Sequence, residues 1–219
     1  MSSVSRAGDP PQAEQVRQRM LLIVAGAAGR IGHDLLGLTV PLRAVLEAAA
    51  ADGVEVSTAP EACRLIERFG AGLQMLAATE RMSVTAELGA VYETIQPLLK
   101  ATLPRGVQLV AELDDAPHVI NAGREAVAQA LFRCCHAVAA AAVAGDRVVV
   151  ARRPSSEAGA IDLRFVLEAA DPERTGDARL AAGLLPRHDD PLIVALGATV
   201  EVRTGKPGPA VVLTVPRTR

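Results

Sequence analysis

A long apolar stripe near the start of the chain most constrains what it can fold into. From Gln12 to Ala51 no convincing turn signal interrupts the sequence, and Pro41 is its only proline. Apolar residues recur there every three or four positions, as expected along one side of an α-helix: Val16, Met20, Ile23, Val24, Ala27, Ile31, Leu35, Leu38 and Leu42. The stripe predicts one long helix with a kink at Pro41, whose ring nitrogen carries no hydrogen. The small, polar residues 1–11 before it predict a disordered tail.

A second helix follows a short connection. Asp52 and Gly53 end the first pattern, and Thr58 comes shortly before Pro60, which suits the first position of a helix. Apolar periodicity then continues to about Arg81. Two helices joined this way make an antiparallel hairpin over residues 12–83. A lone hairpin cannot bury both sides of its stripes, so we expect a homodimer whose two hairpins form a four-helix bundle.

The remaining residues, 84–219, change character and predict an α/β sandwich. Helical patterns are followed by alternating strand patterns, and the last two strands flank the turn sequence GKPGP. The order predicts an α+β fold with largely antiparallel pairing. Expected helices are 86–101, 123–144 and a short one ending at Leu196, and expected strands are 107–113, 147–153, 161–169, 199–204 and 210–215.

Composition excludes several functional classes. An isoelectric point near 6.1, evenly mixed charges and 2% aromatic residues argue against nucleic-acid binding. We find no apolar run that could span a bilayer and no secretory signal, so we expect no membrane partner. The three cysteines are an odd number, and the adjacent Cys134 and Cys135 have few partners for zinc. We expect a reduced, cytoplasmic protein without a metal site, in which these two cysteines pack in the core.

The segment GAAGRIGHDLLGL allows two incompatible interpretations. Gly26, Gly29 and Gly32 follow an apolar run and could form the glycine turn of an NAD(P)-binding Rossmann oxidoreductase. That fold alternates strands and helices, yet the next candidate strand, Val54–Val56, is short and no third appears before Val107. We keep the Rossmann interpretation as the less favoured alternative. In the helical interpretation, the glycines are small residues at a tight helix contact.

The helical interpretation directs attention to His33 and Asp34. Imidazole is largely uncharged near neutral pH and is a competent nucleophile for phosphoryl transfer. A neighbouring carboxylate can accept a hydrogen bond from the other ring nitrogen and help to remove a proton. His33 is therefore a candidate phosphoacceptor with Asp34 as its hydrogen-bonding or base partner. His118, His136 and His188 lack complementary partners in the sequence pattern, so we expect structural roles for them.

Residues 12–216 resemble the catalytic core of bacterial two-component histidine kinases. The matching segments are GRIGHDLLGL, AELGAVYETIQPLLKATLPRGVQLVAEL, REAVAQALFRCCHAV and LIVALGATVEVRTGKPGPAVVLTVP, in the family's order and spacing. The resemblance implies a dimerising helical hairpin that carries a phosphorylated histidine, followed by an ATPase-like sandwich.

The chain departs from this family where the kinases bind ATP. Arg133 and Ala137 stand at the positions of the asparagines that hold the magnesium of ATP, and neither can replace them, because Ala137 offers no oxygen and Arg133 is itself cationic. The glycine-rich loop expected after 161–169 is replaced by DPERTGDARLAAGLLP. Backbone approach to phosphates requires those glycines. We therefore expect no ATP binding and no autokinase activity.

The HDLLG sequence is similar to the boxes of the ChpT-like histidine phosphotransferases of alphaproteobacteria, although Leu38 stands where they carry proline. This resemblance implies a phosphorelay protein that passes phosphate between receiver aspartates through His33. Its partners would be response-regulator receiver domains, with a hybrid histidine kinase as a further candidate, and it would need no cofactor because the receiver supplies the magnesium. We expect docking at Arg30, Gly37, Val40 and Pro41. The open alternative is a pseudokinase scaffold that regulates a two-component partner by binding alone.

Overall fold

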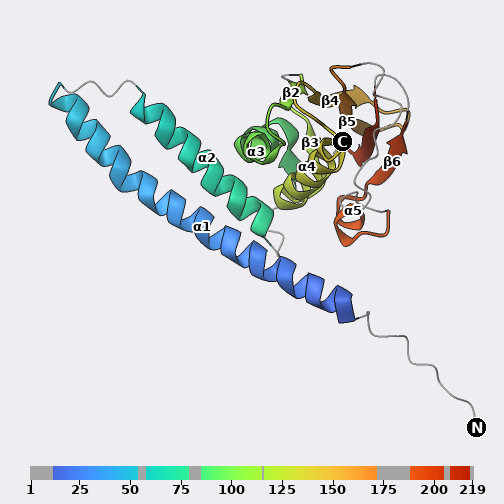
Figure 1. Ribbon diagram of the computed structural model, residues 1–219, viewed down its shortest axis with the longest axis horizontal. Helices are drawn as coiled ribbons and strands as arrows, with labels where there is room; N and C mark the ends of the chain where they lie inside the picture. The colour runs from blue at the N-terminus through green and yellow to red at the C-terminus, as the bar shows by residue number, and fades with distance from the viewer. Residues whose placement is uncertain are drawn as a thin grey trace, which may run out of the picture.

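The computed structural model describes residues 12–53, 58–78, 85–114, 116–171, 188–204 and 208–217 of the 219. The side chains of residues 12–27 and 30 fall outside that description. A helical hairpin lies beside an α/β sandwich, and helix α2 runs between helix α1 and the sandwich (Figure 1). None of the helices within the described ranges is long and apolar enough to cross a membrane. The predicted tail and the predicted boundary at residues 83 and 84 lie outside the described residues.

The hairpin consists of α1, Gln12–Ala51, and α2, Ala59–Ala77. The long first helix is confirmed and continues through Pro41 to Ala51. Helix α2 begins as predicted with proline in its first turn, but it ends before the expected Arg81. Gly26, Gly29 and Gly32 all lie inside α1, so the strand, turn and helix that a Rossmann domain requires there are absent. The Rossmann interpretation was wrong because the apolar run before the glycines belongs to the helical stripe.

The two helices of the hairpin pack closely at glycines. A Cβ atom at Gly32 would lie 2.6 Å from the carbonyl oxygen of Gly70, and one at Gly70 would lie 2.8 Å from the carbonyl oxygen of Gly32. A Cβ at Gly29 would meet Ala77 at 3.3 Å. Backbone therefore packs on backbone here, and the small-residue role expected of Gly29 and Gly32 is confirmed.

The sandwich places two helices on a five-stranded sheet. Strand order is β2-β4-β5-β7-β6; the β2–β4 pair is parallel and the other pairs are antiparallel, which confirms the expected largely antiparallel pairing. Helix α4 packs over β4, β5 and β7, while α3 lies beside β2. The bounds are α3 Leu88–Thr102, α4 Arg124–Ala139, α5 Pro191–Leu196, β2 Gln108–Glu112, β4 Arg147–Pro154, β5 Ala160–Glu168, β6 Thr199–Arg203 and β7 Ala210–Pro216.

Two details of the sandwich differ from the sequence-based expectation. The structure contains a short antiparallel ribbon that was not predicted. It pairs β1, Ala86–Glu87, which comes just before α3, with β3, Val119–Ile120, which comes just before α4. Glu87 ends that ribbon and caps α3, since its carboxylate accepts hydrogen bonds from the backbone N–H groups of Gly89 and Ala90. Helix α4 ends at Ala139 and not at the expected residue 144. The alanines that follow favour a helix, but the chain must turn there to enter β4, and this tertiary constraint overrides their helix propensity.

Candidate functional site

His33 projects from the middle of α1 into solvent. Its side chain is 81% exposed and that of Asp34 is 78% exposed. The Nδ1 atom of His33 lies 3.5 Å from Oδ1 of Asp34, which is a long contact between exposed groups. Within the described residues, no hydrogen bond engages Nε2 of His33. The imidazole is thus accessible to a partner molecule, and Asp34 is close enough to orient it after a small adjustment.

Three sectors of α1 have different surroundings, as a helix of 3.6 residues per turn allows. The first sector faces α2 and contains Gly32, the buried Thr39, and Arg43, which pairs with Glu67 of α2. The second is apolar and exposed: Ile31, Leu38, Leu42 and Val45 are 54%, 64%, 40% and 64% exposed. His33 belongs to the third sector, roughly 160° around the helix from the apolar one. A partner covering the apolar sector would leave His33 accessible.

The residues predicted for docking fall in the same part of α1 as His33. Gly37 would place a Cβ in open space, Val40 is 73% exposed, and Pro41 is exposed as well. Together with His33, Asp34 and the backbone position of Arg30, they span roughly 120° of the helix surface at about 100° per residue. Gly37 carries no side chain one turn after His33, so the surface on that side of the imidazole offers little steric hindrance to a globular partner.

Arg133 and Ala137, which the sequence resemblance aligned with the magnesium-binding asparagines of kinases, have other surroundings. Arg133 Nη1 lies 2.8 Å from Oδ2 of Asp190, while Oδ1 of Asp190 accepts a hydrogen bond from Leu192 and caps α5. Ala137 is fully buried. In the part of the chain that the structure describes, no group of three or more His, Cys, Asp or Glu side chains could hold a metal ion. Arg133 thus joins α4 to α5 through Asp190, and Ala137 has no oxygen to offer a cation.

Two histidines of the sandwich have partners that the sequence analysis missed. His118 is buried, and its Nε2 lies 2.9 Å from Oδ1 of Asp114, which also pairs with Arg152. The expectation that His118 lacks a complementary partner was wrong, although Asp114 and His118 stand four residues apart and that spacing was a signal. Burial of Asp114 alone would raise its pKa, but the hydrogen bond from His118 and the charge of Arg152 lower it overall.

His136 is likewise partnered. Its Nε2 lies 2.8 Å from Oγ1 of Thr102, and its ring centroid is 4.4 Å from that of Phe132. Burial lowers the pKa of His136 because it disfavours the charged imidazolium. His188 is exposed in a turn. Cys134 and Cys135 are completely buried, which confirms their predicted packing role.

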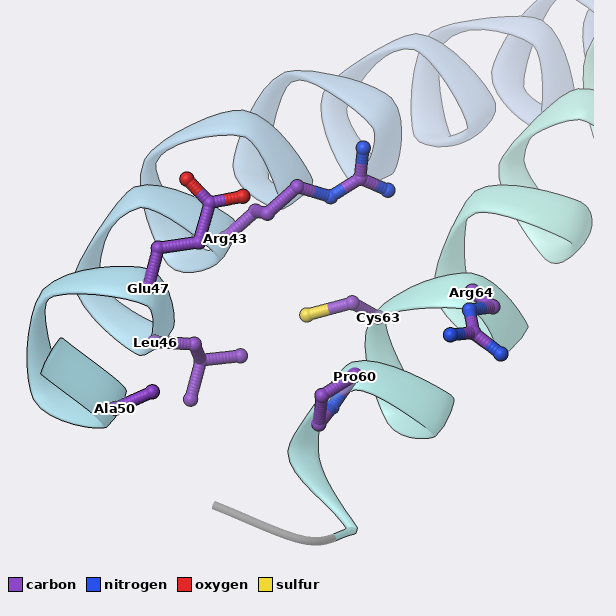
Figure 2. A pocket seen from close by; sticks show the side chains of 7 residues that line it. All are labelled: Arg43, Leu46, Glu47, Ala50, Pro60, Cys63 and Arg64. Atoms are coloured by element: carbon purple, nitrogen blue, oxygen red, sulfur yellow. The ribbon is translucent and has the colours of Figure 1, made fainter. Parts of the chain in front are cut away.

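A separate cavity opens between α1 and α2 near the loop end of the hairpin. Its volume is about 400 Å³, and Arg43, Leu46, Glu47, Ala50, Pro60, Cys63 and Arg64 line it. Figure 2 shows the sulfur of Cys63 directed from α2 towards α1. The α1 residues of this cavity begin ten positions after His33, so it is not part of the same site.

Comparisons with known proteins give structural matches only. No protein-family model matches the chain, and no curated protein does. A mycobacterial sensor histidine kinase, MprB, aligns with a TM-score of 0.47 and 14% identity over 61% of this chain and 97% of its own. A histidine kinase from Burkholderia phymatum aligns with a TM-score of 0.47 and 16% identity over 92% and 97%. The histidine kinase domain of a blue-light activated kinase from Erythrobacter litoralis gives 0.45 and 13% over 88% and 93%. With TM-scores below 0.5, these likenesses establish neither family nor function.

Proposed function

We propose that this chain is a phosphorelay histidine phosphotransferase that passes a phosphoryl group between receiver-domain aspartates through His33. One observation carries the proposal: a highly exposed histidine beside a carboxylate lies on an open sector of a long helix. The HDLLG sequence around it, with its resemblance to ChpT-like phosphotransferases, supports the same role. The proposed partners are response-regulator receivers, and a hybrid histidine kinase is a further candidate donor.

The proposed reaction is a pair of phosphoryl transfers. In the first, a ring nitrogen of His33 attacks phosphorus, the P–N bond forms, and the P–O bond to the donor aspartate breaks, leaving a free carboxylate. In the second, a carboxylate oxygen of the acceptor aspartate attacks phosphorus and the P–N bond breaks. Each receiver brings its own magnesium ion to neutralise the moving charge. Asp34 would accept a hydrogen bond from the other imidazole nitrogen and stabilise the protonated ring.

We propose that the reaction needs neither ATP nor a cofactor of this chain. Arg133 is engaged with Asp190, and the buried Ala137 has no oxygen to offer a magnesium ion. A phosphorylated receiver is therefore the proposed phosphate source. Tight, magnesium-dependent binding of ATP by the purified protein would contradict this part of the proposal.

We also propose a homodimeric four-helix bundle. Its support is the exposed sector of Ile31, Leu38, Leu42 and Val45 on α1, whose spacing of seven, four and three residues is that of a coiled-coil seam. Leu65 of α2 is 51% exposed as well. A second copy of the hairpin would remove these apolar side chains from water.

The test is phosphotransfer from receiver domains of the source organism, each charged with a small-molecule phosphate donor. We expect at least one receiver to yield acid-labile phosphohistidine on the chain, and His33→Ala to abolish it. His188→Ala is the matched control, because His188 is also exposed, and it should transfer at the original rate. Asp34→Asn should slow transfer by about 100-fold, the lower range for a positioned acid or base.

Two outcomes would reject the phosphotransferase. Retention of transfer by His33→Ala would remove the histidine from the reaction. Absence of phosphohistidine with every receiver, combined with binding of a two-component partner, would favour the pseudokinase scaffold, in which His33 has no chemical role.

A further inference from the structure

We infer that a set of contacts between α2 and the sandwich, here called the clamp, fixes the position of the sandwich relative to the part of the hairpin that carries His33. The hairpin and the sandwich then present one preformed surface to a receiver. The clamp is formed by Gln129 of α4, Gly72 of α2 and Leu98 of α3. Only the identity of the partner rests on the proposed function. The clamp itself rests on contacts between α2 and the sandwich.

Gln129 caps the end of α2 from outside the hairpin. The last carbonyl groups of a helix have no partners within it. Residue Ala78, which follows α2, has the extended dihedral angles φ −63° and ψ 124° and forms no left-handed glycine cap. The side-chain Nε2 of Gln129 donates instead to the carbonyl oxygens of Ala78 at 2.9 Å and Leu76 at 3.3 Å. The sandwich thus supplies hydrogen bonds that the end of α2 would otherwise take from water.

Gly72 allows α2 and α3 to pack closely just before that cap. A Cβ atom at Gly72 would lie 2.6 Å from Cδ1 of Leu98 and 3.2 Å from the carbonyl oxygen of Thr94. On the same helix, Met75 and Leu76 pack against the hydrophobic core of the sandwich. The final turns of α2 are therefore part of two structures at once, the hairpin and the core of the sandwich.

The part of α2 that forms the clamp also faces the turn of α1 that precedes His33. A Cβ at Gly32 would touch Cγ of Gln74 at 3.0 Å as well as the carbonyl oxygen of Gly70. His33 is the next residue. Helix α2 lies between α1 and the sandwich (Figure 1). The α2 residues that contact the sandwich, Gly72, Met75 and Leu76, adjoin those that face Gly32, so the sandwich is attached to α2 near the axial level of His33.

A fixed sandwich suits transfer between separate proteins. Phosphorylation by a chain's own nucleotide domain requires that domain to move to the histidine, and a clamp opposes such motion. A separate receiver instead benefits from a rigid surface, because less conformational freedom is lost on binding. The clamp therefore predicts one dominant arrangement of hairpin and sandwich in the free protein.

Distance measurement by pulsed electron paramagnetic resonance tests the clamp. Spin labels would be placed by Glu61→Cys at the start of α2 and Glu157→Cys on the β4–β5 turn, both exposed sites. Native Cys63, Cys134 and Cys135 are buried. Dilution with unlabelled chain isolates pairs within one chain. We expect a single narrow distribution of the distance between the two spin labels, and we expect Gln129→Ala and Gly72→Leu each to broaden it.

Gln108→Ala is the matched control, since Gln108 is an exposed glutamine on β2, and it should leave the distribution narrow. Hydrogen exchange provides a second readout: Gln129→Ala should lower protection of the amides of residues 74–77 by roughly fivefold to thirtyfold, the effect of losing hydrogen bonds of ordinary strength. Gln129→Ala decides the test if Gly72→Leu fails to fold. A broad distribution in the unsubstituted background, or a narrow one in Gln129→Ala, would overturn the clamp.

The same samples separate the clamp from the proposed function. A narrow distribution without phosphotransfer from any receiver would keep the clamp and reject the phosphotransferase. Broadened distances in Gln129→Ala with an unchanged transfer rate would reject the preformed receiver surface. We expect this variant to transfer phosphate severalfold more slowly than Gln108→Ala.

Discussion

The hairpin and the sandwich differ in how far their histidine and arginine side chains are engaged by other residues of the chain. His33 on α1 is 81% exposed, and among the side chains that the structure describes its ring has one polar partner, Asp34 at 3.5 Å. In the sandwich, His118 pairs with Asp114 and His136 contacts Thr102, while Arg133 holds Asp190. The sandwich therefore uses these groups to hold its own elements together. Of these three histidines, the one with an exposed ring lies on the hairpin.

The two regions also differ in how much of their apolar side chains is exposed to solvent. The sandwich buries most of its large apolar side chains, among them Phe165 and Ile95, and leaves only scattered valines exposed among its described residues. Helix α1 instead leaves a row of apolar side chains in solvent, including Leu38 and Val45 at 64% exposure each. The sandwich thus contains a large buried core, whereas α1 carries a continuous row of exposed apolar side chains. The following predictions separate these roles.

The largest expected effect is on self-association. Leu38→Glu combined with Val45→Glu places carboxylates in the proposed bundle seam, where their desolvation costs several kcal/mol. We expect the dimer dissociation constant to rise at least ~100-fold, as measured by analytical ultracentrifugation, with little change in helix content. Val40→Glu, on the His33 side of the same helix, should leave the dimer intact. Equal weakening by Val40→Glu would place the interface elsewhere on α1.

The second effect contrasts two glycines of one helix. Gly32→Ala forces a Cβ towards the carbonyl oxygen of Gly70 at 2.6 Å and should lower the free energy of unfolding by about 2 kcal/mol. Gly37→Ala meets nothing within 4 Å and should raise it by about 0.5–1 kcal/mol, because alanine favours the helix. Chemical denaturation checks both. A stabilising Gly32→Ala would mean that the helices do not touch there.

Introducing asparagines at positions 133 and 137 should destabilise the sandwich without creating a nucleotide site. Ala137 is fully buried, so Ala137→Asn places an amide in the core at a cost of about 1–3 kcal/mol. Arg133→Asn also removes the ion pair with Asp190. For the double variant we expect a lower midpoint of thermal unfolding and no magnesium-dependent ATP binding by calorimetry. Recovered ATP binding would show that only these two side chains separate the sandwich from a nucleotide-binding one.

The smallest effect concerns the pH dependence of stability. Burial lowers the pKa of His136 below its usual value of 6.5, so the unfolded chain takes up this proton more readily than the folded one. The stability that depends on neutral His136 is present above about pH 6.5 and is lost as the pH falls through the lower folded pKa. His136→Gln should flatten the decline in stability on acidification below pH 6.5, measured by denaturant titration. An unchanged slope would assign the decline to other groups.

Sequence patterns predicted the elements best where periodicity was strong. The stripe from Val16 to Leu42 predicted α1, and alternation predicted β5 and the final hairpin of β6 and β7. Element ends were less accurate: α4 stops at Ala139 and the β1–β3 ribbon was missed, because two-residue strands carry no periodicity. For the site, the pattern named His33 and Asp34, but their exposure depends on which side of α1 meets α2.

Local sequence determined the long helix, the hairpin and the chemistry available at His33, because these depend on spacing along a chain and on the properties of single side chains. Only the tertiary structure decided what several other polar side chains do. Gln129 reaches the end of α2 from α4, and Arg133 reaches Asp190, across separations that no short pattern encodes. Such pairs form when packing of the core brings distant segments together, and this packing places Gly32, expected from the sequence at a helix contact, against Gly70 of α2.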